Sequence, residues 1–250
     1  MVTEVEAPAM GPPCVNGVTL TGVRKAFGDV LALDGVDLRV RAGELVAVVG
    51  PSGCGKSTLL ELVCGLATPE AGAVEAPPAA LMPQRDALLP WLSALDNAAL
   101  ARRVAGDSRA AARAAAHQHF AAFGLDGFER ARPAALSGGM RQRVAFIRTL
   151  LSGRPLLCLD EPFASLDALT RAQAQMWLGA ALAREPRTVL LVTHDVEEAV
   201  LLADRIVLLS PRPGRVVLEL DVSLERPRAR TDAAVVALRE RALTALGVEG

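Results

Sequence analysis

The fold is decided by the stretch Leu45-Val46-Ala47-Val48-Val49-Gly50-Pro51-Ser52-Gly53-Cys54-Gly55-Lys56-Ser57-Thr58. Its first five residues are apolar, which is typical of a strand buried on both faces of a sheet. Residues 50–57 then fit the pattern G-x-x-x-x-G-K-S and open an expected helix over residues 56–66. Glycines let such a loop turn its N–H groups toward phosphate oxygens, and the helix N-terminus adds partial positive charge. This stretch therefore predicts a phosphate-binding loop.

Two side chains of the loop have chemistry of their own. We expect Lys56 to reach the β- and γ-phosphates of a nucleotide and the Ser57 hydroxyl to hold Mg²⁺. A glycine-rich turn with an exposed lysine is the alternative, and the flanking strand and helix disfavour it. Cys54 is expected to be only a small residue of the loop. The other predicted nucleotide-binding positions are Gly50, Pro51, Ser52, Gly53, Cys54, Gly55 and Thr58.

Composition and charge narrow the class of protein. The chain has 250 residues, enough for one or two domains, and 51% hydrophobic with 22% charged residues exclude a disordered tail. With 27 basic against 28 acidic residues, the chain has no overall positive electrostatic field that would attract nucleic acid. We therefore predict no nucleic-acid partner. Four scattered cysteines fit a reducing compartment. The acidic start lacks the features of a secretory signal, and no apolar run approaches the ~20 residues of a membrane helix.

The order of expected elements predicts an α/β fold. Residues 1–16 are expected to form a flexible arm, residues 17–230 a single domain and residues 231–250 a region with a C-terminal helix near 232–246. Strands over 156–159, 188–192 and 206–209 alternate with helices over 167–183 and 196–203, as in a parallel sheet with crossover helices. We therefore predict a P-loop NTPase core with a mostly parallel sheet, an N-terminal antiparallel β subdomain, an inserted helical subdomain over about 85–153 and a short strand pair after Pro213.

Polar residues follow two of the predicted strands. Asp160 and Glu161 close the apolar run at 156–159, at the end of a parallel strand where ligands bind. Asp160 suits a Mg²⁺ shell, and Glu161 suits a base or an orienter of the attacking water. His194 follows the strand at 188–192, so it is expected at the same edge, in contact with a γ-phosphate.

A second potential anion site lies at residues 136–143. Ser137 can cap a helix there, and Gly138 and Gly139 leave N–H groups open to an anion, although an ordinary helix start explains the pattern too. Two phosphate-seeking helix ends in one chain suggest that two subunits share nucleotides. The residues alone do not decide whether Phe27 stacks on a base or caps the sheet, and they assign Gln84 no role.

The loop from residue 85 to residue 91 is expected to be stiff because Pro83 and Pro90 flank or lie in it. Its Leu88, Leu89 and Trp91 are typical of a contact hot spot for a partner protein. Packing of Trp91 against the helical subdomain is the alternative.

Taken in order, these motifs resemble the ATP-binding subunits of ABC transporters. The resemblance covers about residues 18–221, although Met140 stands where Gln is commoner and residues 72–82 are shortened. Segments 83–91, 159–171 and 210–215 are similar to the nitrate/sulfonate/taurine importer group, which includes importers of the thiamine pyrimidine precursor. The motifs that carry the resemblance are the loop at 50–57, Gln84, Leu-Ser-Gly-Gly-Met at 136–140, Leu-Asp-Glu-Pro at 159–162, Ser-Leu-Asp at 165–167 and Thr-His-Asp at 193–195.

The resemblance implies a role for each matching residue. Phe27 would stack on adenine, and Lys56, Ser57 and Asp160 would hold the phosphates and Mg²⁺. Glu161 would polarise the water and His194 would contact the γ-phosphate. Gln84 would join the metal site to a membrane partner. The ATP of a second copy or a paralogue would be bound by Ser137, Gly138 and Gly139, with Asp167 at the seam.

The implied function is that of an ATPase motor. Two chains would form a head-to-tail ATP sandwich at the cytoplasmic face of the membrane and drive small-solute uptake through two permease subunits. An extracytoplasmic solute-binding protein would take part indirectly. The alternative is a non-transport ATPase of ABC type, such as an iron–sulfur assembly scaffold. A P-loop kinase would leave residues 136–140 and His194 unexplained.

Overall fold

The main sheet occupies the centre of the molecule. The computed structural model describes residues 17–164, 166–184 and 187–247, so the expected arm over 1–16 and the Ser165 position lie outside the described residues. Six strands lie in the order β5-β6-β7-β3-β8-β9. The first five are parallel and β9 runs antiparallel to β8. Their bounds are β3 Leu45–Val49, β5 Ala79–Met82, β6 Leu156–Asp160, β7 Thr188–Thr193, β8 Arg205–Leu209 and β9 Val216–Asp221.

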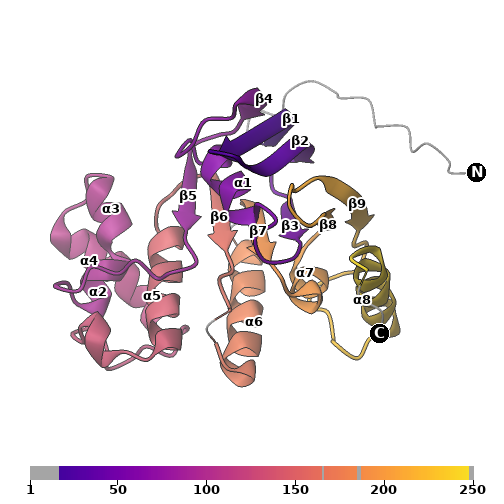
Figure 1. Cartoon of the computed structure of the whole chain (residues 1–250). Helices are drawn as coiled ribbons and strands as arrows, with labels where there is room; N and C mark the ends of the chain where they lie inside the picture. Colours follow the sequence, from indigo (N-terminus) through magenta and orange to yellow (C-terminus); the bar gives the residue numbers. More distant parts are fainter. Residues whose placement is uncertain (1–16, 165, 185–186, 248–250) are drawn as a thin grey trace, which may run out of the picture.

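A smaller antiparallel sheet covers one face of the core. It has the order β2-β1-β4, formed by β1 (Val18–Phe27), β2 (Val30–Val40) and β4 (Ala71–Glu75). Helix α1 (Lys56–Val63) packs between this sheet and the main sheet, as Figure 1 shows, and its apolar side chains join one buried cluster with both. The arrangement places the start of α1 beside the turn between β1 and β2.

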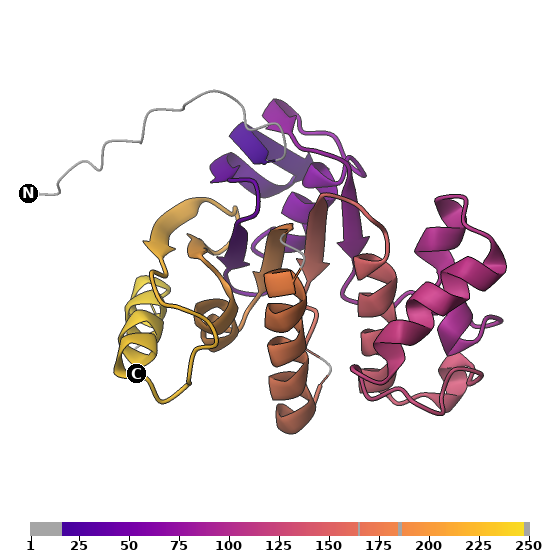
Figure 2. The same ribbon diagram turned by 180° about the vertical axis from the view of Figure 1, so that it is seen from behind.

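The helical subdomain lies beside the β5 edge of the main sheet (Figures 1 and 2). It contains α2 (Ala94–Ala98), α3 (Leu100–Val104), α4 (Arg109–Phe120), a short 3₁₀ turn (Pro133–Ala135) and α5 (Gly138–Leu150). Serine side chains cap three of these helices, since Ser93, Ser108 and Ser137 each accept a hydrogen bond from a backbone N–H of the first turn. The helix cap predicted at Ser137 is therefore present.

Three further helices complete the chain. These are α6 (Ala168–Arg184), α7 (Val196–Leu202) and α8 (Ala233–Ala245). Apolar residues of α6 and α7 pack on the face of the main sheet opposite to α1. The same buried cluster includes apolar residues of the helical subdomain and of α8. No helix among the residues that the structure describes is both long enough and apolar enough to cross a bilayer.

The predicted fold class is confirmed, and one detail is wrong. A single strand, β9, follows Pro213, and residues 222–232, all of which the structure describes, form no second strand. The guanidinium of Arg228 donates instead to the carbonyl oxygens of Val200, Ala203, Val222 and Leu224 at 2.7–3.2 Å. The backbone here is therefore held by a side chain and needs no partner strand.

Candidate nucleotide-binding site

The loop at residues 50–57 surrounds the ammonium group of Lys56. Lys56 is buried, and its Nζ donates to the carbonyl oxygens of Gly50 at 2.7 Å and Pro51 at 3.0 Å. Gly55 has a φ of +102°, and a Cβ there would lie 2.8 Å from the carbonyl oxygen of Ala32. Glycine is thus required at this position. In the described chain no side chain caps the start of α1, so its first N–H groups are open to an anion.

A cleft of about 350 Å³ opens at this loop and draws together residues that are far apart in the sequence. It contains most of the predicted site, including the two residues that the sequence left undecided. Gly50, Pro51 and Cys54 shape the loop and are not among the described residues that line the cleft. The lining is Phe27, Val30, Ala32, Ser52, Gly53, Gly55, Lys56, Ser57, Thr58, Gln84, Asp160, Glu161 and Arg212.

Two adjacent carboxyl groups lie at the end of β6. Burial raises the pKa of Asp160, and the charge of Glu161 raises it further against the opposing effects of Ser57 and Lys56. Glu161 has a φ of +46°, which is strained for a residue with a side chain. Its N–H donates to the carbonyl oxygen of Val192 at 2.8 Å, which holds this conformation at the sheet edge.

His194 meets Glu161 directly. Its Nδ1 lies 2.9 Å from Oε2 of Glu161, because both residues follow parallel neighbouring strands and so stand at the same edge. The structure thus brings together the carboxylate and the imidazole that are separated by more than thirty residues of sequence. Such a pair can orient a water molecule and a phosphate oxygen at the same point.

Ser137, Gly138 and Gly139 stand apart from this group. Ser137 caps α5, its Oγ accepting from the N–H of Met140 at 3.2 Å. A Cβ on Gly139 would lie 3.0 Å from the side chain of Leu166, so the start of α5 adjoins the loop that leads into α6. The three residues are absent from the described lining of the cleft. A nucleotide in the cleft is therefore served by other residues of the same chain.

Sequence reasoning missed Arg212, Val30 and Ala32. Arg212 lies in the loop after β8, on the same edge of the sheet as Glu161, and a basic residue after a parallel strand was the available signal. The two histidines of α4 are not among the described residues that line the cleft. His117 lies 3.8 Å from Glu129 and His119 packs edge-on against Phe123.

Trp91 does not pack into the helical subdomain, because 66% of it is exposed. Its neighbour Leu88 does pack against the core. The loop thus presents an aromatic side chain at the surface while its leucine anchors it.

Residues 33–164, just over half of the chain, match the family model described as ABC transporter. The chain belongs to the ABC transporter family. It is an ATP-binding ATPase of that family, and the resemblance inferred from its motifs is confirmed.

Named relatives cover nearly the whole chain. The aliphatic sulfonates import ATP-binding protein SsuB 1 of Nocardia farcinica is 45% identical over 93% of each chain. A protein of the same name from Burkholderia ambifaria, SsuB, is 47% identical over 95% of this chain and 73% of its own. A dimeric ATP-binding cassette solved in a post-hydrolysis state with ADP and Pi has a TM-score of 0.75 at 29% identity, covering 83% of this chain and all of its own.

Proposed function

We propose that this ATPase is the motor of an importer for aliphatic sulfonates and works as an ATP-sandwich dimer beneath two membrane subunits. The observation that carries the proposal is the meeting of Lys56, Asp160, Glu161 and His194 at one edge of the sheet, in a chain whose relatives are named sulfonate importers. Those names also favour transport over an iron–sulfur assembly scaffold.

ATP binding is assigned to the loop and the cleft around it. Phe27 offers a ring for the adenine, and the N–H groups at the start of α1 and the Lys56 ammonium hold the phosphates. Glu161 orients the attacking water, and His194 contacts the γ-phosphate while its other ring nitrogen faces Glu161. Because Glu161 does not hold the phosphates, binding and hydrolysis depend on different residues.

The donors in the cleft fit Mg²⁺. The Ser57 hydroxyl, the Asp160 carboxyl and the Gln84 amide are hard oxygen ligands around one cleft, and Asp160 is buried beside Ser57. Bound Mg²⁺ supplies charge neutralisation at the phosphates. Asp160 and Ser57 would hold it from the sheet and α1, and Gln84 from the segment after β5.

The second half of each ATP site comes from another copy of the chain. Ser137, Gly138 and Gly139 form an open helix start that the cleft of their own chain does not use. In a head-to-tail pair this helix start faces the partner's γ-phosphate. A dimer of the related cassette with ADP and Pi supports this arrangement.

The loop that carries Trp91 is held on both sides by the helical subdomain. From α5, Arg141 pairs with Asp86 at 2.8 Å, and Arg148 donates to the carbonyl oxygens of Asp86 and Ala87 at 2.8 Å. Helix α5, whose start is proposed to bind the shared ATP, is thus bonded to the loop that follows Gln84. Movement of α5 on ATP binding is passed to this loop.

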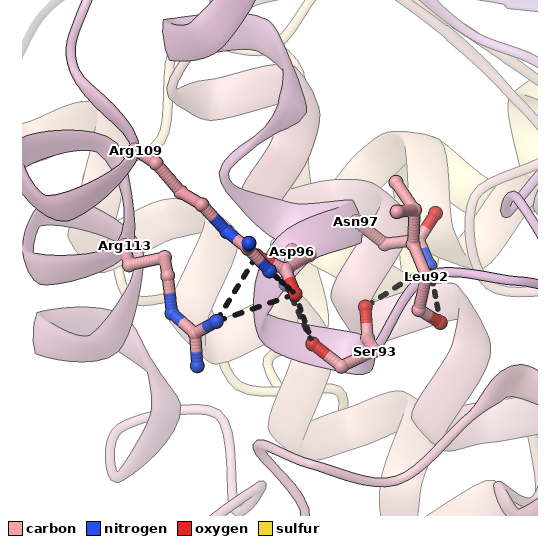
Figure 3. A network of polar contacts seen from close by, with 6 residues as sticks. All are labelled: Leu92, Ser93, Asp96, Asn97, Arg109 and Arg113. Atoms are coloured by element: carbon pink, nitrogen blue, oxygen red, sulfur yellow. Dashed lines mark hydrogen bonds and ion pairs between the residues drawn. The ribbon is translucent and has the colours of Figure 1, made fainter.

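Asn97 of α2 holds the other side of the loop at Leu89. Figure 3 shows its further contacts with Leu92 and Ser93, which follow the loop. Asn97 is fully buried, and its side-chain amide accepts from the N–H of Leu89 at 2.8 Å and donates to the carbonyl oxygens of Leu89, Leu92 and Ser93 at 3.1–3.3 Å. Such a loop presents Trp91 on a rigid base, which suits docking to a membrane subunit.

The Trp91→Ala variant tests the coupling role. In the complex with its membrane subunits and solute-binding protein, we expect the variant to lose sulfonate-stimulated ATP hydrolysis by about tenfold or more, since an aromatic hot spot contributes about 2 kcal/mol. Basal hydrolysis by the isolated subunit should be unchanged. Val217→Ala, at an exposed apolar residue on the far edge strand, is the control and should leave both activities intact.

Full stimulation of the Trp91→Ala complex would contradict the docking role. Unfolding of the variant subunit would likewise contradict it, because an exposed docking residue should not be needed for folding. A wild-type complex that responds to another solute and not to an aliphatic sulfonate would contradict the substrate class and leave the motor function intact.

A further inference from the structure

Glu198 of α7 is a buried carboxyl group that the nucleotide cleft does not use. It is 3% exposed, and its Oε1 has no hydrogen-bond partner among the described residues. Three elements surround it: Thr193 at the end of β7, Asp195 at the start of α7, and Arg171 and Gln175 of α6. Burial of a carboxyl group is costly and calls for a structural or functional reason.

The carboxyl group adjoins the turn that presents His194. Within this turn the N–H of Asp195 donates to Oγ1 of Thr193 at 3.0 Å, so the chain closes tightly around His194. The hydroxyl of Thr193 in turn hydrogen bonds to the Glu198 carboxyl group. The N–H of Glu198 donates to Oδ1 of Asp195 at 3.1 Å. Glu198 therefore touches both neighbours of the histidine that lies 2.9 Å from Glu161.

The same cluster reaches toward the start of α6. Arg171 lies 3.7 Å from Asp195 and donates to the carbonyl oxygen of Leu166 at 3.1 Å. Gln175, one turn further along α6, hydrogen bonds to Glu198. Leu166 in turn adjoins Gly139 at the start of α5. A continuous set of contacts thus runs from the start of α5 to the turn that carries His194. The start of α5 is the one that we propose binds the partner's ATP.

We propose that Glu198 is a positioning residue for ATP hydrolysis, whose buried carboxyl group holds the Thr193–Asp195 turn against α6 and so keeps His194 in register with Glu161. The inference rests on the proposed role of His194. Glu198 is buried and is not among the described residues that line the nucleotide cleft, so we expect it to act on the rate of hydrolysis and not on ATP binding.

The charge state of Glu198 should set how well the turn is held. Burial, and next the charge of Asp195, raise the pKa of Glu198 to about 8, while Thr193, Arg171 and Gln175 oppose the shift. The carboxyl group is thus neutral below that pH and ionised above it. When ionised it repels Asp195 and competes with it for Arg171, so the Arg171–Asp195 pair that ties the turn to α6 is weakened. Two further basic residues lie near the cluster. Arg230 and Arg239 both form ion pairs with Glu197, the residue before Glu198.

The first test is the pH profile of hydrolysis by the purified full chain between about pH 6 and about pH 9.5. We expect the kcat of the wild type to fall as the pH rises through about 8. Glu198→Gln, which is neutral at every pH and of the same shape, should keep its kcat across that range. Glu197→Gln, the adjacent carboxyl group in surface ion pairs, should show the wild-type profile. Identical profiles for the wild type and Glu198→Gln would overturn the proposal.

The second test removes the hydrogen bonds altogether. Glu198→Leu should lower kcat by about tenfold or more, because a small misplacement of a catalytic group has effects of that order, and leave the KM for ATP within about twofold. An unchanged kcat would overturn the proposal, as would a loss confined to KM. If Glu198→Leu does not fold, the profile of Glu198→Gln decides. A wild-type chain that hydrolyses no ATP at all would count against the proposed function instead.

Discussion

We propose that different single residues of the cleft serve ATP binding and ATP hydrolysis. Lys56 is buried in the phosphate-binding loop, whereas Glu161 lies at the end of β6 against His194. We expect Glu161→Gln to bind ATP as the wild type does and to lose about 100-fold or more of kcat, the usual size of such an effect. Lys56→Ala should weaken ATP binding itself. Calorimetric titration with ATP and a phosphate-release assay measure the two properties.

The control for this prediction is Glu240→Gln, an exposed carboxyl group of α8 outside the cleft lining. It should match the wild type in both assays. Normal steady-state hydrolysis by Glu161→Gln would refute the role assigned to Glu161.

At the residue scale, sequence reasoning reached the groups that follow predicted strands. Asp160, Glu161 and His194 were predictable because parallel strands bring their carboxyl ends to one edge. Arg212 was missed because residues 210–215 were used only for the family resemblance and the end of the strand–helix alternation, and no contact in the folded chain was assigned to them. The burial of Glu198 depends on α6 and α7 packing together, and no local pattern encodes it.

At the scale of elements, the loop after β8 closes against the phosphate-binding loop. A Cβ on Gly214 would lie 2.1 Å from the carbonyl oxygen of Cys54. Two hydrogen bonds keep the backbone of Gly214 from moving away from Cys54. Its N–H donates to the carbonyl oxygen of Ala32 at 2.9 Å, and its carbonyl oxygen accepts from the N–H of Asp34 at 3.1 Å. We expect Gly214→Ala to distort the loop and weaken ATP binding by about tenfold, since a misplacement near 1 Å has large effects.

Gly179→Ala is the matched control for Gly214→Ala. In the described chain no atom lies within 4 Å of a Cβ built there, and α6 should tolerate or favour alanine. Titration of both variants with ATP checks the expectation. Wild-type affinity in Gly214→Ala would show that the two loops move independently.

The alternation of strands and helices was predictable at this scale because buried parallel strands leave long apolar runs. The absence of a strand pair after Pro213 was not predictable, because hydrogen bonds from Arg228 to four carbonyl groups take the place of a second strand there. A long-range side-chain contact of this kind leaves no periodic signal. The pairing of β4 with β1, across the loop and α1, likewise depends on tertiary contacts.

At the scale of the whole molecule, the two helix starts that could bind a phosphate, those of α1 and α5, lie on different surfaces. The start of α1 opens into the cleft, and the start of α5 lies against the loop leading to α6. We therefore propose that a second chain completes the site of an ATP bound in the cleft. The sequence pointed to this sharing through the two motifs, but the separation of the two helix starts became visible only in the folded chain.

The most direct measurement is the mass of Glu161→Gln by size exclusion with light scattering, with and without ATP. We predict a monomer without nucleotide and a dimer with Mg-free ATP, because ATP is held but not consumed. Adding Ser137→Arg should abolish the dimer by blocking the helix start, whereas Ser108→Arg, which removes the equivalent cap of α4, should not. A dimer that forms without ATP, or that survives Ser137→Arg, would contradict the shared site.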